Sequence, residues 1–517
     1  MNKLNLIPLF LFSAVLLLFV SCEKEAKKPN IIFLLTDDQR DNTFNSMGHP
    51  WINTPNIDNL IQNGVRFSNT YIAEPVCSPS RVSIFTGLHE RVHGVGFTSS
   101  YHLTDDQWED TYPAMLGNNG YYTGFIGKFG VEYYTFNAED KFDYWWAHDG
   151  WTKFFPKEYD TNSTIPYHRA ENDIITPIMG EAIKDFIAKS PEDKPFCLSV
   201  SFNVPHGSQT MSMYDTDEGR IMMAPANENP KLKGHPLYGD LYRDLDIDIP
   251  DQVGSDPYRH IPEFILDQEK GRKRLYIYDY NEKSDREHHI RYYQTITGVD
   301  KVVGDMIKSL EERGVEDNTI IIFASDHGLL MGEYGMGGKA LLYDLTSKIP
   351  CFVYDPGLKS SYKGQTIDKL VSSLDITSTI LDYAGLSSTE HMEGKSLKPL
   401  IYGKNADWRE EIFLESLFTA RDNPFCEGIR QGDWKYIRMH DGMLPYMESD
   451  LYFSGKAPAY EQLFNLKEDP EENNNLINQY EGSEMLERFR EKTQEYSEDL
   501  NTKRKNYMGV KNCELGR

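Results

Sequence analysis

The sequence predicts an α/β protein whose core is a large, mostly parallel mixed sheet between two layers of helices. Short, continuous apolar runs such as residues 30–35 and 318–324 are typical of strands that are buried on both faces. Amphipathic segments such as residues 172–188 alternate with these runs, as helices do when they cover such a sheet. After about residue 405 the pattern changes to short strands joined by turns, which predicts a smaller C-terminal α+β subdomain with an antiparallel sheet.

The elements of the main sheet follow in order along the chain. A strand at residues 30–35 precedes a helix at residues 54–64, which Thr54 caps and Pro55 begins. A strand at residues 65–73 then leads into a helix that begins near Cys77. Further strands are expected at residues 121–128, 195–204, 318–324 and 349–354, and further helices at residues 172–188, 286–313 and 376–384.

A chain of 517 residues is too long for one ordinary core, so two domains are expected. The larger one spans residues 29–404 and the C-terminal subdomain spans residues 405–517. Residues 207–285 are rich in Pro, Gly, Asp and Tyr and have no sustained period, which predicts an irregular insertion on the substrate side. In the C-terminal subdomain, strands are expected at residues 412–415, 428–430 and 434–439 and a helix at residues 483–500.

Residues 1–21 are interpreted as a lipoprotein signal peptide. A charged start is followed by an apolar run from Leu4 to Val20 and a small residue before Cys22. We expect cleavage before Cys22, attachment of lipid to that residue, and a flexible tether at residues 22–28. A transmembrane anchor is the alternative, although the run is at the short limit for one. The mature protein is therefore expected to be exported and anchored by its lipid, in the periplasm or at the cell surface.

The formal net charge of -26 argues against a general binder of nucleic acid or of membrane surfaces. No nucleic-acid partner is expected, and contact with a membrane is expected only through the lipid. An anionic substrate would have to be captured by local cations against the overall field of the protein.

Four of the six cysteines remain when Cys22 and Cys77 are set aside. Cys197 and Cys351 lie in apolar, strand-like runs and are expected to be buried thiols. Cys426 and Cys513 are able to pair in an oxidising compartment, but spacing alone does not decide whether they do.

Cys77 occupies the place of a reactive residue at a helix start, in the segment E-P-V-C-S-P-S-R-V-S-I-F-T-G. Pro79 is tolerated in a first helical turn, and the free N–H groups there favour an anion. Arg81 follows one turn later on the same face, where its guanidinium can hold an oxyanion. A buried structural cysteine is the alternative interpretation of this segment.

Polar side chains follow several of the predicted strands, where the chemistry of a parallel sheet gathers. Asp37 and Asp38 end the first strand, and Asp326 and His327 end another. Each pair alone is commonly a turn cap, but two pairs at two strand ends favour a hard cation such as Ca²⁺ or Mg²⁺. Lys128, His206 and Lys339 complete the set, although each taken singly is more often a solvated lysine or a structural histidine.

Over about residues 29–480 the chain resembles the type I, formylglycine-dependent sulfatases of the alkaline phosphatase superfamily. The resemblance rests on motifs in the family order: P-N-I-I-F-L-L-T-D-D, T-P-N-I-D-N-L, C-S-P-S-R-V-S-I-F-T-G, G-K-F, P-H, S-D-H-G-L-L-M-G-E-Y-G, G-K-A-L-L-Y-D and the tail L-F-N-L-K-E-D-P-E-E-N-N-N-L. It implies an alkaline phosphatase-like fold, with residues 29–404 as the sulfatase catalytic domain.

The resemblance also implies the roles of the site residues. A maturation enzyme would oxidise Cys77 to formylglycine (3-oxoalanine), whose hydrate has one hydroxyl to attack sulfur and a second to release sulfate afterwards. By this resemblance, one Ca²⁺ would be bound by Asp37, Asp38, Asp326 and His327 together with residue 77. The sulfate group and the hydrated aldehyde would be held by Arg81, Lys128 and Lys339. The leaving alcohol would be protonated by His206, with help from Lys339.

One departure from the family pattern concerns the base that releases sulfate. The family usually places a histidine two or three residues after the lysine of its G-K motif, whereas Lys128 is followed by Phe129, Gly130 and Val131. This leaves the base unassigned. His93, His102 and His148 are the candidates from other loops, and a metal-bound group or a subfamily with a different pocket are alternatives.

The function expected from these features is hydrolysis of O-sulfate esters on a sulfated glycan. A phosphodiester or phosphonate monoester hydrolase is the second hypothesis, because relatives in the superfamily share the C-x-P-x-R nucleophile. A glycan-binding lipoprotein that has lost turnover is the third.

Overall fold

The computed structural model describes residues 27–97, 102–131, 138–148, 154–155, 174–206, 232–250, 282–404, 407–418, 423–440 and 457–512. Its largest sheet has eight strands in the order β10-β2-β9-β6-β1-β5-β3-β4. These strands are β1 (Asn30–Asp37), β2 (Val65–Tyr71), β3 (Tyr122–Lys128), β4 (Tyr144–His148), β5 (Phe196–Pro205), β6 (Thr319–Ser325), β9 (Cys351–Tyr354) and β10 (Gln365–Ser372).

The sheet is mixed but mostly parallel, which confirms the predicted fold class. Only β9 runs against its neighbours β2 and β6, and the other pairs in this sheet are parallel. The two edge strands, β4 and β10, were absent from the sequence-based prediction. The first half of β10 is largely exposed, so its polar sequence does not show the apolar run by which buried strands are recognised.

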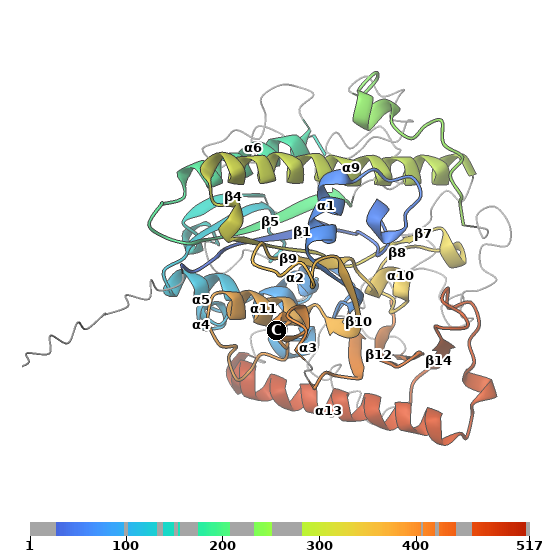
Figure 1. Ribbon diagram of the computed structural model, residues 1–517. Helices are drawn as coiled ribbons and strands as arrows, with labels where there is room; N and C mark the ends of the chain where they lie inside the picture. Colours follow the sequence, from blue (N-terminus) through green and yellow to red (C-terminus); the bar gives the residue numbers. More distant parts are fainter. Residues whose placement is uncertain are drawn as a thin grey trace, which may run out of the picture.

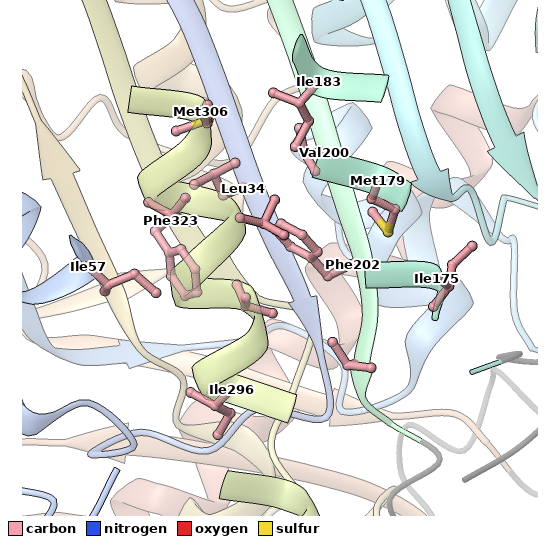
Figure 2. Close-up of a cluster of buried hydrophobic side chains, with 14 of the residues drawn as sticks. Leu34, Ile57, Ile175, Met179, Ile183, Val200, Phe202, Ile296, Met306 and Phe323 are labelled. Atoms are coloured by element: carbon pink, nitrogen blue, oxygen red, sulfur yellow. The ribbon is translucent and has the colours of Figure 1, made fainter. Parts of the chain in front are cut away.

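Helices cover both faces of this sheet (Figure 1). One face carries α1 (Pro55–Asn63), α6 (Ile175–Lys189) and α9 (Glu282–Arg313), and the other carries α2 (Cys77–Thr86), α5 (Tyr112–Asn118) and α11 (Leu374–Tyr383). Side chains of β1 alternate between the two cores, with Ile32 and Leu34 in the first and Ile31 and Phe33 in the second. Figure 2 shows the first core, where strand residues Leu34, Val200, Phe202 and Phe323 meet helix residues Met179, Ile183, Ile296 and Met306.

The C-terminal part of the chain has the predicted antiparallel sheet. Its strands are β11 (Glu411–Ser416), β12 (Phe425–Gln431), β13 (Trp434–His440) and β14 (Tyr460–Asn465), paired in that order. Helix α13 (Glu484–Asn512) packs beside it (Figure 1). The boundary between residues 404 and 405 stays a prediction.

Several other predictions fall largely outside the described residues. These are the signal peptide, Cys22 and most of the insertion at residues 207–285, within which residues 232–250 contain the short helix η5 (Pro236–Asp240). Helix α9 begins at Glu282, inside the range given to the insertion. Among the described helices, none combines the length and apolar composition needed to cross a membrane.

Cys197 and Cys351 are buried free thiols, and Cys426 is buried as well. Burial raises the pKa of Cys197 and of Cys351 to about 12, so both are inert thiols. Cys513 lies outside the described residues, and its pairing with Cys426 stays untested.

Candidate active site

The carboxyl ends of β1, β5 and β6 bring the predicted acidic residues together. β1 lies between β5 and β6, and its Thr36 is paired with Ser325 of β6. This register places Asp37 and Asp38 beside Asp326, whose Oδ1 accepts a hydrogen bond from the Asp38 N–H at 3.1 Å. Asp38 adopts a left-handed conformation with φ of 69°, which turns the chain at the strand end.

Cys77 is the first residue of α2 and is only 2% exposed. Its sulfur lies 2.8 Å from Nζ of Lys339, 3.3 Å from Nε2 of His327 and 3.5 Å from Oδ1 of Asp37. The structure therefore brings residues from four separate segments of the chain into contact at one sulfur atom.

Arg81 is buried one helical turn after Cys77. Its Nη2 lies 2.8 Å from Oδ2 of Asp326, and its Nη1 donates to the carbonyl of Lys128 at 2.9 Å. The same Nη1 donates to the hydroxyl of Ser201 on β5. These contacts join α2 to the carboxyl ends of β3 and β6 and to the middle of β5.

Lys128 and Lys339 neutralise the paired carboxylates. Lys128 forms an ion pair with Asp37, and Nζ of Lys339 lies 2.8 Å from Oδ1 of Asp38. Although burial alone would raise the pKa of Asp37, Lys128 holds it well below its ordinary value. Although burial alone would lower the pKa of Lys339, Asp38 holds it well above its ordinary value, so the ammonium is charged.

His206 follows β5, and its backbone N–H donates to the carbonyl of Asp37 at 3.0 Å. Its Nε2 lies 3.8 Å from Oδ2 of Asp38. Burial lowers the pKa of His206 to about 4. The imidazole is therefore uncharged at neutral pH when no ligand is bound.

The acidic residues also fit a metal ion. Two groups have ligand atoms within 4.8 Å of one another: Asp37, Asp38, Cys77 and His206, and Asp37, Cys77, Asp326 and His327. The buried Oδ2 of Asp38 has no hydrogen-bond partner among the described residues, as expected of an oxygen kept for a cation. The three carboxylates, Asp37, Asp38 and Asp326, offer the hard oxygen ligands that suit Ca²⁺ or Mg²⁺.

The positions where the family usually has a histidine are filled in other ways. Gly130 has φ of +66°, and a Cβ there would lie 2.8 Å from Cδ of Arg81, so this position excludes a side chain. Val131 is buried in the second core of the sheet. Phe129 packs against Phe85, with ring centroids 5.8 Å apart.

The three candidate replacements lie in different surroundings. Nε2 of His93 lies 3.0 Å from the hydroxyl of Ser83, and burial lowers the pKa of His93 to about 3. His148 is opposite Lys128 in the pairing of β3 with β4, and only its backbone is described. His102 is partly buried. The base for sulfate release therefore stays unassigned.

Two residues of the site carried no signal in the sequence. Ser201 holds Arg81 from β5, and Tyr292 on α9 donates its hydroxyl to the carbonyl of Asp38 at 2.8 Å. Neither belongs to a motif, because a serine in a buried strand and a tyrosine on an amphipathic helix are common in ordinary cores. Only the packing of β5 and α9 beside β1 identifies them.

Comparison with known proteins gives consistent matches along the chain. A family model described as "Sulfatase" matches residues 29–386, more than half of the chain, and one described as "N-sulphoglucosamine sulphohydrolase, C-terminal" matches residues 332–499. An arylsulfatase of Clostridium perfringens is 29% identical over 500 residues, which cover 90% of this chain and 93% of the relative. An N-acetylglucosamine-6-O-sulfatase of Bacteroides thetaiotaomicron is 25% identical, with 92% and 88% covered.

Among solved structures, BT4656 in complex with its substrate D-glucosamine-2-N,6-O-disulfate has a similar fold. Its TM-score is 0.72 at 21% sequence identity, and the match covers 92% of this chain and 99% of that one.

Proposed function

The chain belongs to the sulfatase family and is a sulfuric ester hydrolase, and we propose that its substrate is a glycan that carries O-sulfate esters. The observation that carries this proposal is the meeting of Cys77, at the start of α2, with the ammonium groups of Lys128 and Lys339 around three carboxylates. The glycan is supported by the relatives, one named an N-acetylglucosamine-6-O-sulfatase and one solved with a glucosamine disulfate.

In this proposal the cations hold the sulfate group. Lys128 pairs with Asp37 and Lys339 pairs with Asp38, and both are able to turn their ammonium groups toward sulfate oxygens. The positive charge of Arg81 adds to that of the two lysines. Its hydrogen bonds to Asp326 and to the Lys128 carbonyl keep the ends of β6 and β3 in place. Positive charge around the ester stabilises the negative charge that develops as its S–O bond breaks.

Cys77 is proposed to be the precursor of formylglycine, so that its sulfur marks the place of the nucleophilic oxygen. The hydrated aldehyde would supply two hydroxyls, one to attack sulfur and one to permit release of sulfate. One Ca²⁺ is proposed to be held by Asp37, Asp38, Asp326 and His327 together with residue 77, and it would draw electron density from the sulfate oxygens.

His206 is proposed to protonate the leaving alcohol, with help from Lys339. The uncharged imidazole of the free protein must gain a proton for this role. A bound sulfate ester brings negative charge next to the ring, which favours the imidazolium and raises the pKa of His206 in the complex. Substrate binding would thus favour the protonated form of His206 that donates the proton.

We also propose that the protein is exported and anchored by lipid on Cys22, in the periplasm or at the cell surface. Support comes from the charged start, the apolar run and the small residue before Cys22. A maturation enzyme that converts Cys77 is the one further protein partner of this proposal.

The deciding experiment is a sulfate-release screen of matured protein over defined sulfated mono- and oligosaccharides. The proposal expects release from at least one O-sulfated sugar. Faster hydrolysis of phenyl phosphonate than of any sulfate ester, with bound Mn²⁺ or Zn²⁺, would favour a phosphonate hydrolase instead. Binding of sulfated sugars without any release by matured protein would favour the non-catalytic alternative.

A further inference from the structure

The loop that carries Lys339 is held by the C-terminal sheet. It lies between β8 (Gly337–Gly338) and α10 (Asp344–Ser347), and Asp344 holds its C-terminal end. The backbone N–H of Asp344 donates to Oε2 of Glu472 at 2.6 Å, and its Oδ1 accepts from Nζ of Lys435 on β13 at 2.7 Å. Its Oδ2 accepts from the hydroxyl of Tyr71 at 2.9 Å.

Lys435 joins two carboxylates that would otherwise repel each other. The residue is fully buried, and its ammonium lies 2.7 Å from Oδ1 of Asp344 and 2.7 Å from Oε1 of Glu472. Glu472 is 4% exposed and belongs to the tail motif E-D-P-E-E-N, to which the catalytic proposal gives no role. Removal of this cation would leave two buried carboxylates facing each other, an arrangement that must move apart or take up a proton.

The short stretch between Lys339 and Asp344 is buried along its length. Ala340 is buried with φ of 74°, and its N–H donates to the carbonyl of Pro75, next to the Cys77 segment. Leu341, Leu342 and Tyr343 are buried in the small core between the loop and the C-terminal sheet. Because every residue between them is packed, a displacement of Asp344 also displaces Lys339.

We propose that Lys435 is a positioning residue for sulfate ester hydrolysis: by holding Asp344 and Glu472 together, it places the ammonium of Lys339 against residue 77 and Asp38. The inference rests on the catalytic role proposed for Lys339. It gives the C-terminal sheet and the tail motif a part in the reaction, although no residue of that sheet reaches the active site through a described contact.

The test compares Lys435→Met with Arg409→Met in the full chain. Arg409 also makes a mostly buried ion pair between the C-terminal part and the main sheet domain, but its partner is Asp375, outside the Lys339 loop. Two measurements are made: amide hydrogen exchange of residues 337–344, and the kcat and KM of sulfate release by matured protein. Each variant is also made in a Lys339→Ala background.

For Lys435→Met we expect at least ~10-fold faster exchange in residues 337–344. We expect a fall in kcat of ~10²-fold with KM changed less than about threefold, because misplacement by about 1 Å acts on the chemical step. In the Lys339→Ala background, the same change should cause no further loss, since it acts through Lys339. Arg409→Met should leave exchange in this loop and kcat within about threefold of the parent, whatever its effect on thermal stability.

The inference would be overturned if Lys435→Met lowered kcat as much in the Lys339→Ala background as in the parent. It would also be overturned if Lys435→Met left both exchange and kcat unchanged. If Lys435→Met does not fold, Tyr71→Phe replaces it, because it removes the hydrogen bond from the Tyr71 hydroxyl to Asp344, together with the bond that this hydroxyl accepts from Nε of Arg430, while Lys435 stays in place. In that variant, exchange of residues 337–344 should be ~3–10-fold faster and kcat ~3–10-fold lower than in the parent. Unchanged exchange and kcat would contradict the proposal. If the parent releases no sulfate from any sugar, the exchange measurement still decides the positioning role while the proposed function fails.

Discussion

Nζ of Lys339 lies 2.8 Å from the sulfur of Cys77, although the two residues are 262 positions apart in the chain. The same ammonium lies 2.8 Å from Oδ1 of Asp38. One cation therefore contacts both the proposed nucleophile position and the proposed metal ligands, so its placement affects attack and charge balance together. This relationship depends on correct packing of the loop between β8 and α10.

Replacement of Cys77 by Ala should abolish sulfate release, with a loss of more than ~10³-fold in kcat, because an alanine side chain cannot be converted to an aldehyde hydrate. Calorimetry should show that Cys77→Ala still binds a sulfated sugar, because Lys128 and Lys339 remain. Mass spectrometry of the peptide around residue 77 should find the aldehyde in active parent protein. An unmodified thiol in fully active protein would be incompatible with the mechanism.

Removal of bound metal by a chelator should lower sulfate release by at least ~10-fold and lower the unfolding temperature, because Asp37, Asp38 and Asp326 lose the ion's share of the positive charge around them. Ca²⁺ at about 100 times its Kd should restore activity and stabilise the fold by about 2.7 kcal/mol. Differential scanning calorimetry of Asp38→Asn is the control, since this variant should show little response to Ca²⁺. An active protein that retains no metal after chelation would refute the proposed site.

Gly130→Ala should impair catalysis by displacing Arg81, without removing any side chain of the site. Its φ of +66° is strained for alanine, and the new Cβ would lie 2.8 Å from Cδ of Arg81. We expect about 1 kcal/mol of destabilisation together with a ~10–100-fold fall in kcat/KM.

The matched control for this change is Gly120→Ala. Gly120 has φ of +86°, but nothing lies within 4 Å of its added Cβ. In the Gly120→Ala variant, urea unfolding should show a free energy of unfolding lower by about the same 1 kcal/mol, while kcat/KM is retained. Equal activity in the two variants would show that Arg81 tolerates the displacement.

The pair His89–Glu393 should make folding stability depend on pH. Nδ1 of His89 lies 2.7 Å from Oε2 of Glu393. Although burial alone would raise the pKa of Glu393, His89 and Lys503 lower it to about 2. Although burial alone would lower the pKa of His89, Glu393 raises it above its ordinary value.

The ionised Glu393 therefore stabilises the fold above its ordinary pKa of 4.5, and this contribution is lost as the pH falls toward 2. The protonated His89 stabilises the fold below its ordinary pKa of 6.5, and this contribution is lost as the pH rises through its higher folded value. Glu393→Gln should thus cost about 1–3 kcal/mol at pH 5.5 and less at pH 8.5, measured by urea unfolding. Glu390→Gln, with a side chain that is 88% exposed, should cost less than about 0.5 kcal/mol at both pH values.

Strands buried on both faces were predictable because their sequences are continuously apolar, as in β1 and β6. The edge strands β4 and β10 were not, because an edge needs no such run, and half of β10 is open to solvent. The missing histidine was visible in the sequence, but the close approach of Arg81 to Gly130, which leaves no room for a side chain there, was not.

The sequence by itself determined the class of fold, the residue types of the site and the order of its motifs, because strand burial, helix capping and ligand chemistry depend on neighbouring residues. Only the tertiary structure decided how the pieces meet. It brought Ser201 into hydrogen-bond contact with Arg81 and Tyr292 with the carbonyl of Asp38, and it paired Lys435 of the C-terminal sheet with Asp344 at the end of the Lys339 loop. These contacts come from parallel register and from packing between segments far apart in the chain, and no local pattern of residues encodes them.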